Sequence, residues 1–241
     1  MELVILAAGK GSRIFKSINR NKCLIKIYNQ TLIEKIVNDA NSLKIFEKIN
    51  IVIGYRKNKI MKKLKNYKIN FIFNKDYNKK EMLHSLKLGI KNSKKDTLVT
   101  YSDIIFSKNV FEDINKMHKT KYILPVLKNW KKIWKVRKKK IIEDCESLNF
   151  DRNFYLTDIG KKIINENMPK GQFMGIFFIP KNEIKKTINY IDQNKNNKKM
   201  HTTSFIDYLV SKKQKIKCIV KNYNWYEFDD IEDLKNFKKI N

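Results

Sequence analysis

The sequence is poor in the residues that mark secreted, membrane-spanning and metal-cluster proteins. It has three cysteines, Cys23, Cys145 and Cys218, and their wide separation predicts free thiols rather than a metal cluster. Free thiols favour a reduced, cytoplasmic setting. No stretch approaches the roughly 18 apolar residues that a membrane helix needs, and MELVILAAGKG at the start has no basic segment before its apolar run. We therefore expect a cytoplasmic protein with no signal peptide and no membrane insertion.

Proline and glycine are also scarce, with 3 and 7 residues. The chain has no linker rich in either residue, no internal repeat and no low-complexity segment. Its hydrophobic fraction of 42% is enough for one sizeable core. We expect a single domain over residues 1–241.

Acidic residues are few, 24 against 53 lysines and arginines, and the formal net charge is +29. Such a charge raises the hypothesis of a nucleic-acid-binding protein. The lysines are spread along the chain, however, and their densest run is KNWKKIWKVRKKK at 128–140. Trp130 and Trp134 in this run fit a stacking platform for single strands, and they equally fit a solvated face with both rings turned inward. We keep nucleic-acid binding as an alternative from another functional class.

Apolar runs alternate with amphipathic segments in the first half of the chain. Strands are predicted at 3–6, 49–54, 69–74 and 96–103, and helices at 31–43, 57–64 and 82–90. In the second half we expect strands at 136–142, 172–179, 216–220 and 225–228, and helices at 203–210 and 231–240. The alternation predicts an α/β fold with a mostly parallel sheet and helices on both faces. Its ligand should lie at the carboxyl ends of the strands.

The first predicted strand leads into a glycine loop, LVILAAGKGSR. A dinucleotide fingerprint needs a third glycine where this chain has Ile14, and no Gly-Lys-Ser/Thr follows at Walker spacing. Both of those phosphate-binding motifs are excluded. Backbone amides next to Gly9 and Gly11 can still cradle phosphate oxygens, while Arg13 and Lys22 neutralise their charge.

LAAGKGSR, followed by NKCLIKI and LIEKIV, resembles the opening signature of the nucleotidyltransferases that activate sugar phosphates and alcohol phosphates. One departure is Asn21, where that family usually has proline. NKDYNKKEMLHSLKLG, TYSDIIF, GQFMGIFFIP and WYEFDDIEDL resemble later motifs of the family in the expected order. The segment KNWKKIWKVRKKKIIEDCESLNFD with YLTDIGKK resembles the branch that makes CDP-linked compounds for surface polysaccharides.

The resemblance implies a Rossmann-like three-layer fold with a mixed, mostly parallel central sheet. Residues 1–125 would bind the nucleotide, and residues 126–241 would bind the acceptor and close with a metal-binding motif. The implied reaction transfers CMP from CTP to a small phosphorylated or phosphonate acceptor, with Mg²⁺ as cofactor and pyrophosphate as the second product. The substrates bring their own nucleophile, so such a protein supplies positioning and charge neutralisation.

The same resemblance assigns residues to roles. Lys22 would meet the charge at the α-phosphate and Arg13 would hold the β- and γ-oxygens. The metal carboxylates would be Asp103, Glu227 and Asp229. The nucleotide-binding residues would be Leu6, Ala7, Ala8, Gly9, Gly11, Ser12, Arg13, Lys22, Ser85 and Ser102. The acceptor-binding residues would include Phe173 and Gly175 of GQFMGIFFIP, which resembles the strand that enters the acceptor pocket. Tyr155 and Trp225 are added to them as aromatic residues that could contact a substrate amine.

Several alternatives stay open at this point. Asp103 could cap a helix, and Asp230 is better placed than Asp229 to cap the last one. A choline-type acceptor would need an aromatic cage, for which Tyr155, Phe173, Trp130, Trp134 and Tyr226 are candidates. Asp144, Glu146 and Asp158 could instead pair with a primary or secondary ammonium. A sugar-1-phosphate nucleotidyltransferase that uses another nucleoside triphosphate is the alternative within the family.

Overall fold

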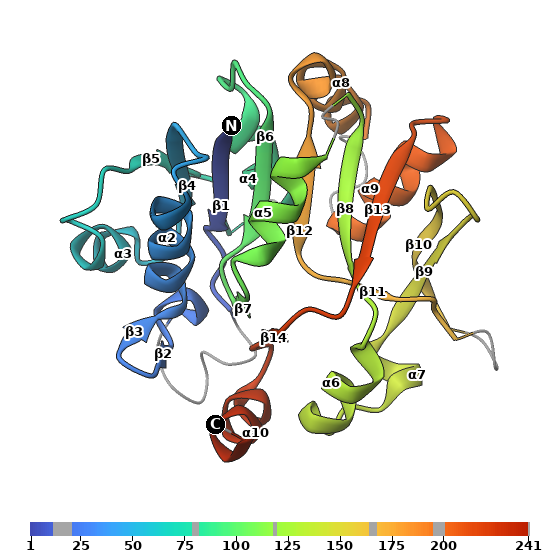
Figure 1. Cartoon of the computed structure of the whole chain (residues 1–241). Coiled ribbons are helices and arrows are strands. Elements are labelled where there is room, and N and C mark those ends of the chain that lie inside the picture. Colours follow the sequence, from blue (N-terminus) through green and yellow to red (C-terminus); the bar gives the residue numbers. More distant parts are fainter. Residues whose placement is uncertain (12–20, 79–81, 118–119, 164–167, 195–200, 241) are drawn as a thin grey trace.

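The structure is a computed structural model that describes residues 1–11, 21–78, 82–117, 120–163, 168–194 and 201–240. Its centre is one large sheet, whose strands are β1 (Glu2–Ala7), β4 (Lys48–Ile53), β5 (Asn70–Phe73), β6 (Thr97–Tyr101), β8 (Tyr122–Leu127), β11 (Gln172–Phe173), β12 (Ile176–Ile179) and β13 (Ile216–Lys221). They run in the order β11-β8-β12-β6-β1-β4-β5, and β13 pairs with β8 (Figure 1).

The sheet is mixed and mostly parallel. β1 is parallel to β4 and β6, β4 is parallel to β5, and β13 is parallel to β8. β12 runs antiparallel to both β6 and β8, and β11 is antiparallel to β8. This confirms the predicted α/β class and the mixed sheet.

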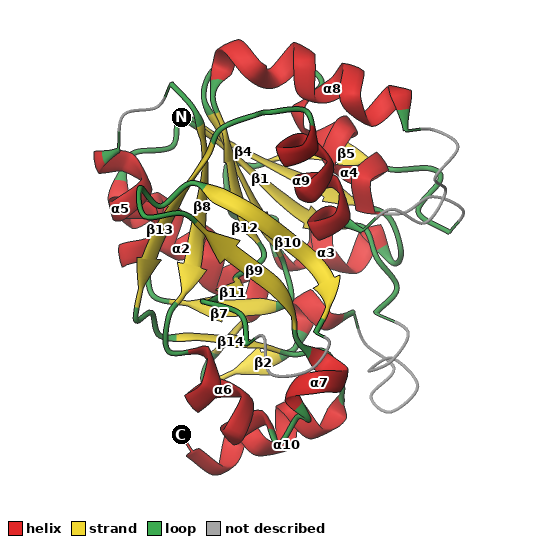
Figure 2. Cartoon of the chain, turned by 90° about the vertical axis from the view of Figure 1, so that its right-hand side faces the viewer, coloured by secondary structure: helices red, strands yellow, loops and turns green. Residues whose placement is uncertain are grey.

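The helices cover both faces of this sheet. They are α2 (Leu32–Leu43), α3 (Lys57–Lys63), α4 (Met82–Ile90), α5 (Asn109–Lys116), α8 (Ile184–Gln193) and α9 (Thr202–Ser211). Figure 2 shows α2 and α5 on one side of the sheet and α4, α8 and α9 on the other. The chain therefore has the three layers that were predicted. No helix in the described ranges has the length and apolar character needed to cross a membrane.

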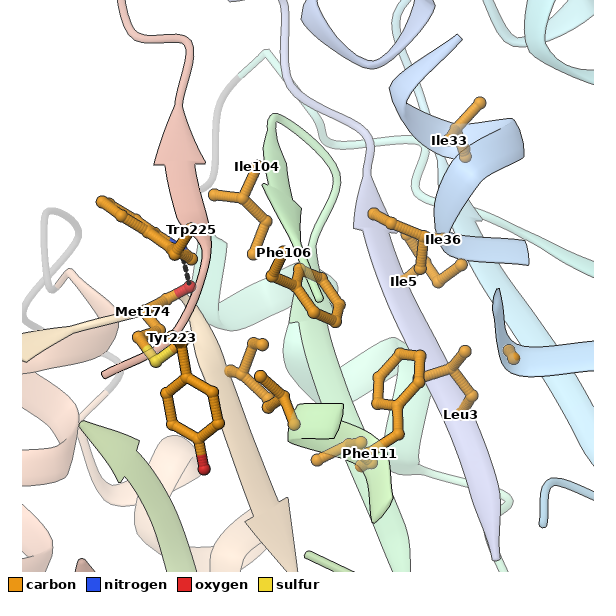
Figure 3. Close-up of a cluster of buried hydrophobic side chains, with 14 of the residues drawn as sticks. Leu3, Ile5, Ile33, Ile36, Ile104, Phe106, Phe111, Met174, Tyr223 and Trp225 are labelled. Carbon is orange, nitrogen blue, oxygen red and sulfur yellow. Dashed lines mark hydrogen bonds between the residues drawn. The ribbon is translucent and has the colours of Figure 1, made fainter. Parts of the chain in front are cut away.

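The apolar pattern of β1 explains why it lies at the centre. All six of its residues are buried, as a parallel strand with helices on both faces requires. Leu3 and Ile5 join the core cluster that contains Ile36 of α2 and Phe111 of α5 (Figure 3). Val4 and Leu6 point to the opposite face and pack in the cluster that contains α4, α8 and α9. Successive side chains alternate faces because a strand has a period of two.

The strand register places the glycine loop after β1 and the residues after β6 at the same edge of the sheet. Ala7 pairs with Ile53, and Leu6 pairs with Tyr101, so the carboxyl ends of β1, β4 and β6 lie side by side. The hydroxyl of Ser102, directly after β6, donates to the carbonyl of Leu6 over 2.8 Å. This hydrogen bond joins the glycine loop to the end of β6.

Smaller elements lie beyond this edge. They are η1 (Lys22–Leu24), β2 (Lys26–Ile27), β3 (Gln30–Thr31), β7 (Ile104–Phe106), α6 (Trp130–Arg137), α7 (Ile141–Asp144), β14 (Trp225–Glu227) and α10 (Ile231–Ile240). A hairpin of β9 (Glu146–Phe150) and β10 (Leu156–Lys162) stands apart from the main sheet, and η2 (Lys181–Glu183) precedes α8. In Figure 1, α6, α7 and α10 lie below the carboxyl ends of the central strands.

Side-chain caps are present at the start of α2 and of α10. Thr31 accepts from the backbone N–H of Glu34, whose carboxylate accepts from the Thr31 N–H in return, so α2 begins with a capping box. At α10 the Asp230 carboxylate accepts the backbone N–H groups of Glu232 and Asp233. Asp230, rather than Asp229, caps this helix, and the Asp229 side chain is left for another contact.

The strand predicted at 136–142 is wrong. This segment contains the end of α6 and the first two residues of α7, and Lys138, just after α6, is in the left-handed region at φ 57°. The buried residues of α6 are Trp130, Trp134 and Arg137, a spacing of four and three that places them on one helical face. The short apolar pattern at Val136–Ile142 was ambiguous because it omitted the two tryptophans that set the helical period.

Candidate active site

The edge that carries the glycine loop holds a cavity of about 300 Å³, called here the nucleotide cavity. Its walls come from the loop after β1, from η1, from the end of β6 and from the first turns of α4 and α9. The residues predicted to bind the nucleotide that line it are Leu6, Ala7, Ala8, Gly9, Gly11, Lys22, Ser85 and Ser102. Ser12 and Arg13 lie outside the described residues.

The presence of glycine at position 11 has a steric explanation that the sequence alone did not indicate. Its φ is +61°, and a Cβ at this position would lie 2.7 Å from Cγ of Lys22. The glycine therefore lets the Lys22 side chain pass directly over the loop. Gly9 differs, because a Cβ there would meet no atom of the described residues within 4 Å, its chain neighbours aside.

Hydrogen bonds of buried polar side chains connect the segments around the nucleotide cavity. Asn74 donates through Nδ2 to Oγ of Ser85 over 3.0 Å and accepts the backbone N–H of Asp76. Asn21 is 1% exposed and donates to the carbonyl of Tyr55 over 2.8 Å. This bond fixes the chain just before Lys22, at the position where the resembled family usually has proline.

Lys22 is the centre of the charged part of the site. Its Nζ lies 2.8 Å from Oδ1 of Asp229 and 3.2 Å from Oδ2 of Asp103. The three side chains are only 13%, 14% and 22% exposed for Lys22, Asp229 and Asp103. Burial by itself would lower the pKa of Lys22, but the carboxylates of Asp103 and Asp229 more than offset it and raise that pKa. The ammonium is therefore held in its charged form.

Strand pairing explains how residues so distant in sequence meet. β14 lies antiparallel to β7, with Glu227 opposite Ile104. The N–H of Phe228 also donates to the carbonyl of Asp103 over 3.0 Å. These backbone bonds place Glu227 and Asp229 beside Asp103, and the β7–β14 pair brings the C-terminal motif to the carboxyl edge of the sheet.

Glu227 is the third predicted metal carboxylate. Burial raises its pKa from 4.5 to about 7; nearby Arg137 opposes the rise, and the charges of Asp103 and Asp229 add to it. Nη1 of Arg137 lies 3.7 Å from Oε2 of Glu227. Three carboxylates near one lysine thus leave a surplus of negative charge.

This donor set fits a hard divalent cation. Mg²⁺ prefers oxygen ligands and keeps several waters, so two carboxylates from different strands suffice with substrate oxygens. Asp103 and Asp229 already converge on one positive charge, the Lys22 ammonium. Over the described ranges no three His, Cys, Asp or Glu side chains are arranged to hold a metal by themselves. The residues therefore fit a site that depends on the substrate for its remaining ligands.

A second cavity of about 460 Å³, called here the acceptor cavity, adjoins the first. The two cavities share Lys22, Met82, Tyr101, Asp103 and His201, so they meet at the charged cluster. Phe173, Gly175 and Trp225, three of the predicted acceptor residues, line the second cavity. Gly175 has φ +73°, and a Cβ there would lie 2.8 Å from the Tyr101 ring.

Tyr155, the fourth predicted acceptor residue, is not among the residues that line either cavity. Its hydroxyl accepts from Nζ of Lys121 over 2.9 Å, and Lys215 and Lys217 lie over its ring. It bridges to Lys217 of β13, away from the other three residues. The prediction grouped it with them by residue type, which carries no information on where a side chain points.

The aromatic residues of the basic run are buried. Trp130 and Trp134 are 2% and 4% exposed and contact each other edge to face. Trp134 also stacks on Trp225, whose indole N–H donates to the carbonyl of Met174 over 2.9 Å (Figure 3). The run at 128–140 therefore presents neither tryptophan as a platform for nucleic-acid bases.

Sequence reasoning missed several residues of the two cavities. His201 and Thr202 line the nucleotide cavity at the start of α9, and neither lies in a motif that the sequence analysis assigned to the nucleotide. Arg137 is hidden in a run of lysines, yet it is 1% exposed and bonds Asp233 through Nε and Nη2. The usable signal was its position three residues after Trp134, on the buried face of α6.

Comparison with known proteins agrees with this geometry. The chain is 29% identical to a CTP:phosphoglutamine cytidylyltransferase of Campylobacter jejuni, covering 98% of each chain. It shares the fold of the CTP:phosphocholine cytidylyltransferase of Streptococcus pneumoniae, with a TM-score of 0.78, 20% identity and coverage of 99% and 98% of the two chains. It also shares the fold of an inositol-1-phosphate CTP transferase from T. maritima, with a TM-score of 0.76, 17% identity and coverage of 99% and 95%.

The family match covers the part of the chain that carries the nucleotide cavity. Residues 3–148, more than half of the sequence, match the family described as the MobA-like NTP transferase domain. This range includes the glycine loop, Lys22, Ser85 and Asp103. The chain belongs to this family and is a nucleotidyltransferase.

Proposed function

We propose that this protein transfers CMP from CTP to a small phosphorylated acceptor and releases pyrophosphate, with Mg²⁺ as its cofactor. One observation carries the proposal: Lys22, Asp103 and Asp229 form a single ion-paired cluster where two cavities meet. A group transfer needs two adjoining substrate sites with charge neutralisation between them. The choice of CTP is supported by the printed activities of the relative and of the two structural neighbours.

The proposed reaction needs no nucleophile from the protein. An oxygen of the acceptor phosphate forms a bond to the α-phosphorus of CTP, and the bond from that phosphorus to the pyrophosphate oxygen breaks. The acceptor phosphate is largely deprotonated near pH 7, so no base has to remove a proton. The electron pair leaves with pyrophosphate.

Lys22 is assigned to the charge that grows at the α-phosphate. It enters the nucleotide cavity beside Gly11 and is kept protonated by its two carboxylate partners. An interaction with developing charge is stronger in the transition state than in the ground state, so it accelerates the chemical step. Arg13 is assigned to the β- and γ-phosphates on the resemblance of the loop alone.

Asp103 and Asp229 are assigned to Mg²⁺, with Glu227 as a further ligand. When bound, the ion would neutralise phosphate charge at the junction of the cavities. Burial and its acidic neighbours hold the pKa of Glu227 near 7, and a divalent cation beside it would favour its charged form. The use of the product in surface polysaccharides stays a prediction from the sequence resemblance.

The test is a pyrophosphate-release screen of CTP, UTP, GTP and dTTP against phosphorylated acceptors. The panel contains phosphoglutamine, phosphocholine, phosphoethanolamine, inositol 1-phosphate and glucose 1-phosphate. We expect CTP to exceed UTP by at least about tenfold in kcat/KM, which is about 1.4 kcal/mol of transition-state discrimination. Turnover of a sugar 1-phosphate with UTP, GTP or dTTP would establish the alternative within the family, and no release with any pair would refute the proposal.

A further inference from the structure

The acceptor cavity is strongly acidic in a chain that is strongly basic. Six acidic residues of the described ranges line it: Asp103, Glu143, Asp144, Glu146, Glu227 and Asp229. The lysine and the arginine that the structure describes in this lining are already paired, Lys22 with Asp103 and Asp229, and Arg137 with Asp233. Negative charge at the junction matches a metal ion, which would in turn bind phosphate oxygens. Glu143, Asp144 and Glu146 come from α7 and β9 and need a different explanation.

Among these three carboxylates, Glu146 is the one best able to bind a ligand, because the other two already have a basic partner. Asp144 lies 3.5 Å from Nη1 of Arg137, and Glu143 lies 3.0 Å from Nζ of Lys140. Within the described parts of the chain, the Glu146 carboxylate has no salt bridge or hydrogen bond, although the residue is partly buried. A partly buried carboxylate gains most from a charge-assisted hydrogen bond, which an ammonium with N–H bonds supplies.

Much of the aromatic surface near this wall is already in contact with other side chains. Phe173, which lines the cavity, packs edge to face against Tyr101 at 5.8 Å. Trp134 stacks on Trp225 at 6.0 Å with an angle of 9°, and the Arg137 guanidinium lies 5.0 Å from its ring centre. Trp130, Tyr226 and Tyr155 do not line the cavity. A quaternary ammonium needs open aromatic faces and has no N–H to donate. The wall is therefore suited to a primary or secondary ammonium.

Trp134 indicates a second feature of the ligand, a hydrogen-bond acceptor, independently of Glu146. It lines the acceptor cavity and is 4% exposed, and its indole Nε1 has no hydrogen-bond partner in the described structure. A buried donor without a partner costs free energy that a ligand's acceptor atom would recover. A carboxylate or amide oxygen on the ligand would satisfy this N–H.

We propose, on the basis of the function proposed above, that Glu146 and Trp134 select an amino-acid-like acceptor. Glu146, beside Asp144, holds a protonated primary or secondary amine of the phosphorylated acceptor. The Trp134 indole N–H donates to a carboxylate or amide oxygen of the same molecule. The phosphate lies at the opposite end, at the junction with Lys22.

The first test compares acceptors that differ only at the amine: phosphoglutamine with its α-N-acetyl derivative, and phosphoethanolamine with phosphocholine. The free-amine member should have the higher kcat/KM, by about tenfold to a hundredfold, the range for a hydrogen bond to a charged group. Glu146→Gln should raise KM for the free-amine acceptor and remove this preference. The matched control is Glu232→Gln, whose carboxylate is 59% exposed on α10 and outside the cavity lining.

The second test compares O-phosphoserine with phosphoethanolamine, which differ by one carboxylate. Trp134→Phe keeps the ring but removes the N–H, and it should lower the phosphoserine-to-phosphoethanolamine ratio of kcat/KM by about threefold to tenfold. An unchanged ratio would overturn the role of Trp134. Equal or better use of phosphocholine or the acetylated acceptor, or a preference that survives in Glu146→Gln, would overturn the role of Glu146. Failure of every acceptor with CTP would instead refute the proposed function.

Discussion

Replacing Lys22 with methionine should destabilise the metal-free protein and increase its response to Mg²⁺. The change removes a charge that lies 2.8 Å from Asp229 and 3.2 Å from Asp103, at side chains no more than 22% exposed. Removing one partner of a fully buried pair costs about 3–5 kcal/mol, and an exposed pair is worth about 0–1 kcal/mol. We expect about 2 kcal/mol for this partly buried cluster, which lowers Tm by about 4–8 °C in a protein of this size.

Mg²⁺ should restore much of this loss, because the ion replaces the positive charge between the two carboxylates. At about 100 times its Kd, a ligand stabilises the folded state by about 2.7 kcal/mol. In the unsubstituted protein the ion competes with the Lys22 ammonium, so its effect on Tm should be smaller. Turnover of the variant should fall by on the order of a hundredfold while its affinity for CTP changes much less.

Calorimetric unfolding with EDTA and with MgCl₂ measures the stability changes, and titration with CTP measures the affinity. The control is Lys221→Met, which removes a lysine paired to Asp113 at 2.7 Å but 53% exposed. It should change neither Tm nor the Mg²⁺ response appreciably. An equal Mg²⁺ shift in Lys22→Met and in the unsubstituted protein would show that the metal does not bind between these carboxylates.

Three further predictions concern the same cluster. Glu227 has a folded-state pKa of about 7 against 4.5, so the folded state binds its proton more tightly, and the resulting stability should be lost as pH rises from about 5 to 8. Glu227→Gln should flatten this fall in EDTA-treated protein, and an unchanged pH profile of Tm would refute the assignment. Gly11→Val, at φ +61° and with Cβ 2.7 Å from Lys22 Cγ, should abolish CTP binding in calorimetric titration; normal affinity would contradict the loop's role. Asp103→Asn should cripple pyrophosphate release but preserve the circular dichroism spectrum, and near-normal release with Mg²⁺ would refute its role as a metal ligand.

In the first half of the chain, the strands of the central sheet and the helices between them could be predicted from local sequence patterns. β1, β4, β5 and β6 are short, mostly apolar runs, and α2, which lies between β1 and β4 in the sequence, begins with the Thr31–Glu34 capping box. Parallel pairing then places the strand ends together, so the glycine loop and Asp103 were expected at one edge. Here local propensity and tertiary packing agree.

The second half depended on contacts that a local pattern does not contain. Trp134 stacks on Trp225, and Arg137 bonds Asp233, although the partners are 91 and 96 positions apart in the sequence. These contacts stabilise α6, so the prediction of a strand at 136–142 was wrong. Tyr155 was grouped with the acceptor residues by residue type alone, and its position beside Lys121 and Lys217 is set by pairing with β13.

The charged cluster was predicted only in part. Resemblance named Lys22, Asp103 and Asp229, but it gave no indication that the lysine bridges both carboxylates. That arrangement depends on β7–β14 pairing and on the space left by Gly11. The strand pairing is a tertiary contact, since β7 and β14 lie in opposite halves of the sequence.

The central claim is that the two cavities hold CTP and a phosphorylated acceptor on either side of Lys22. The most direct measurement is a ³¹P NMR spectrum of the protein incubated with CTP, phosphoglutamine and Mg²⁺, beside a sample with EDTA. We predict pyrophosphate and a new diphosphate signal from the CMP-linked acceptor, both dependent on Mg²⁺. Release of CMP without a linked product, or no consumption of CTP with phosphoglutamine or the other acceptors, would contradict the account.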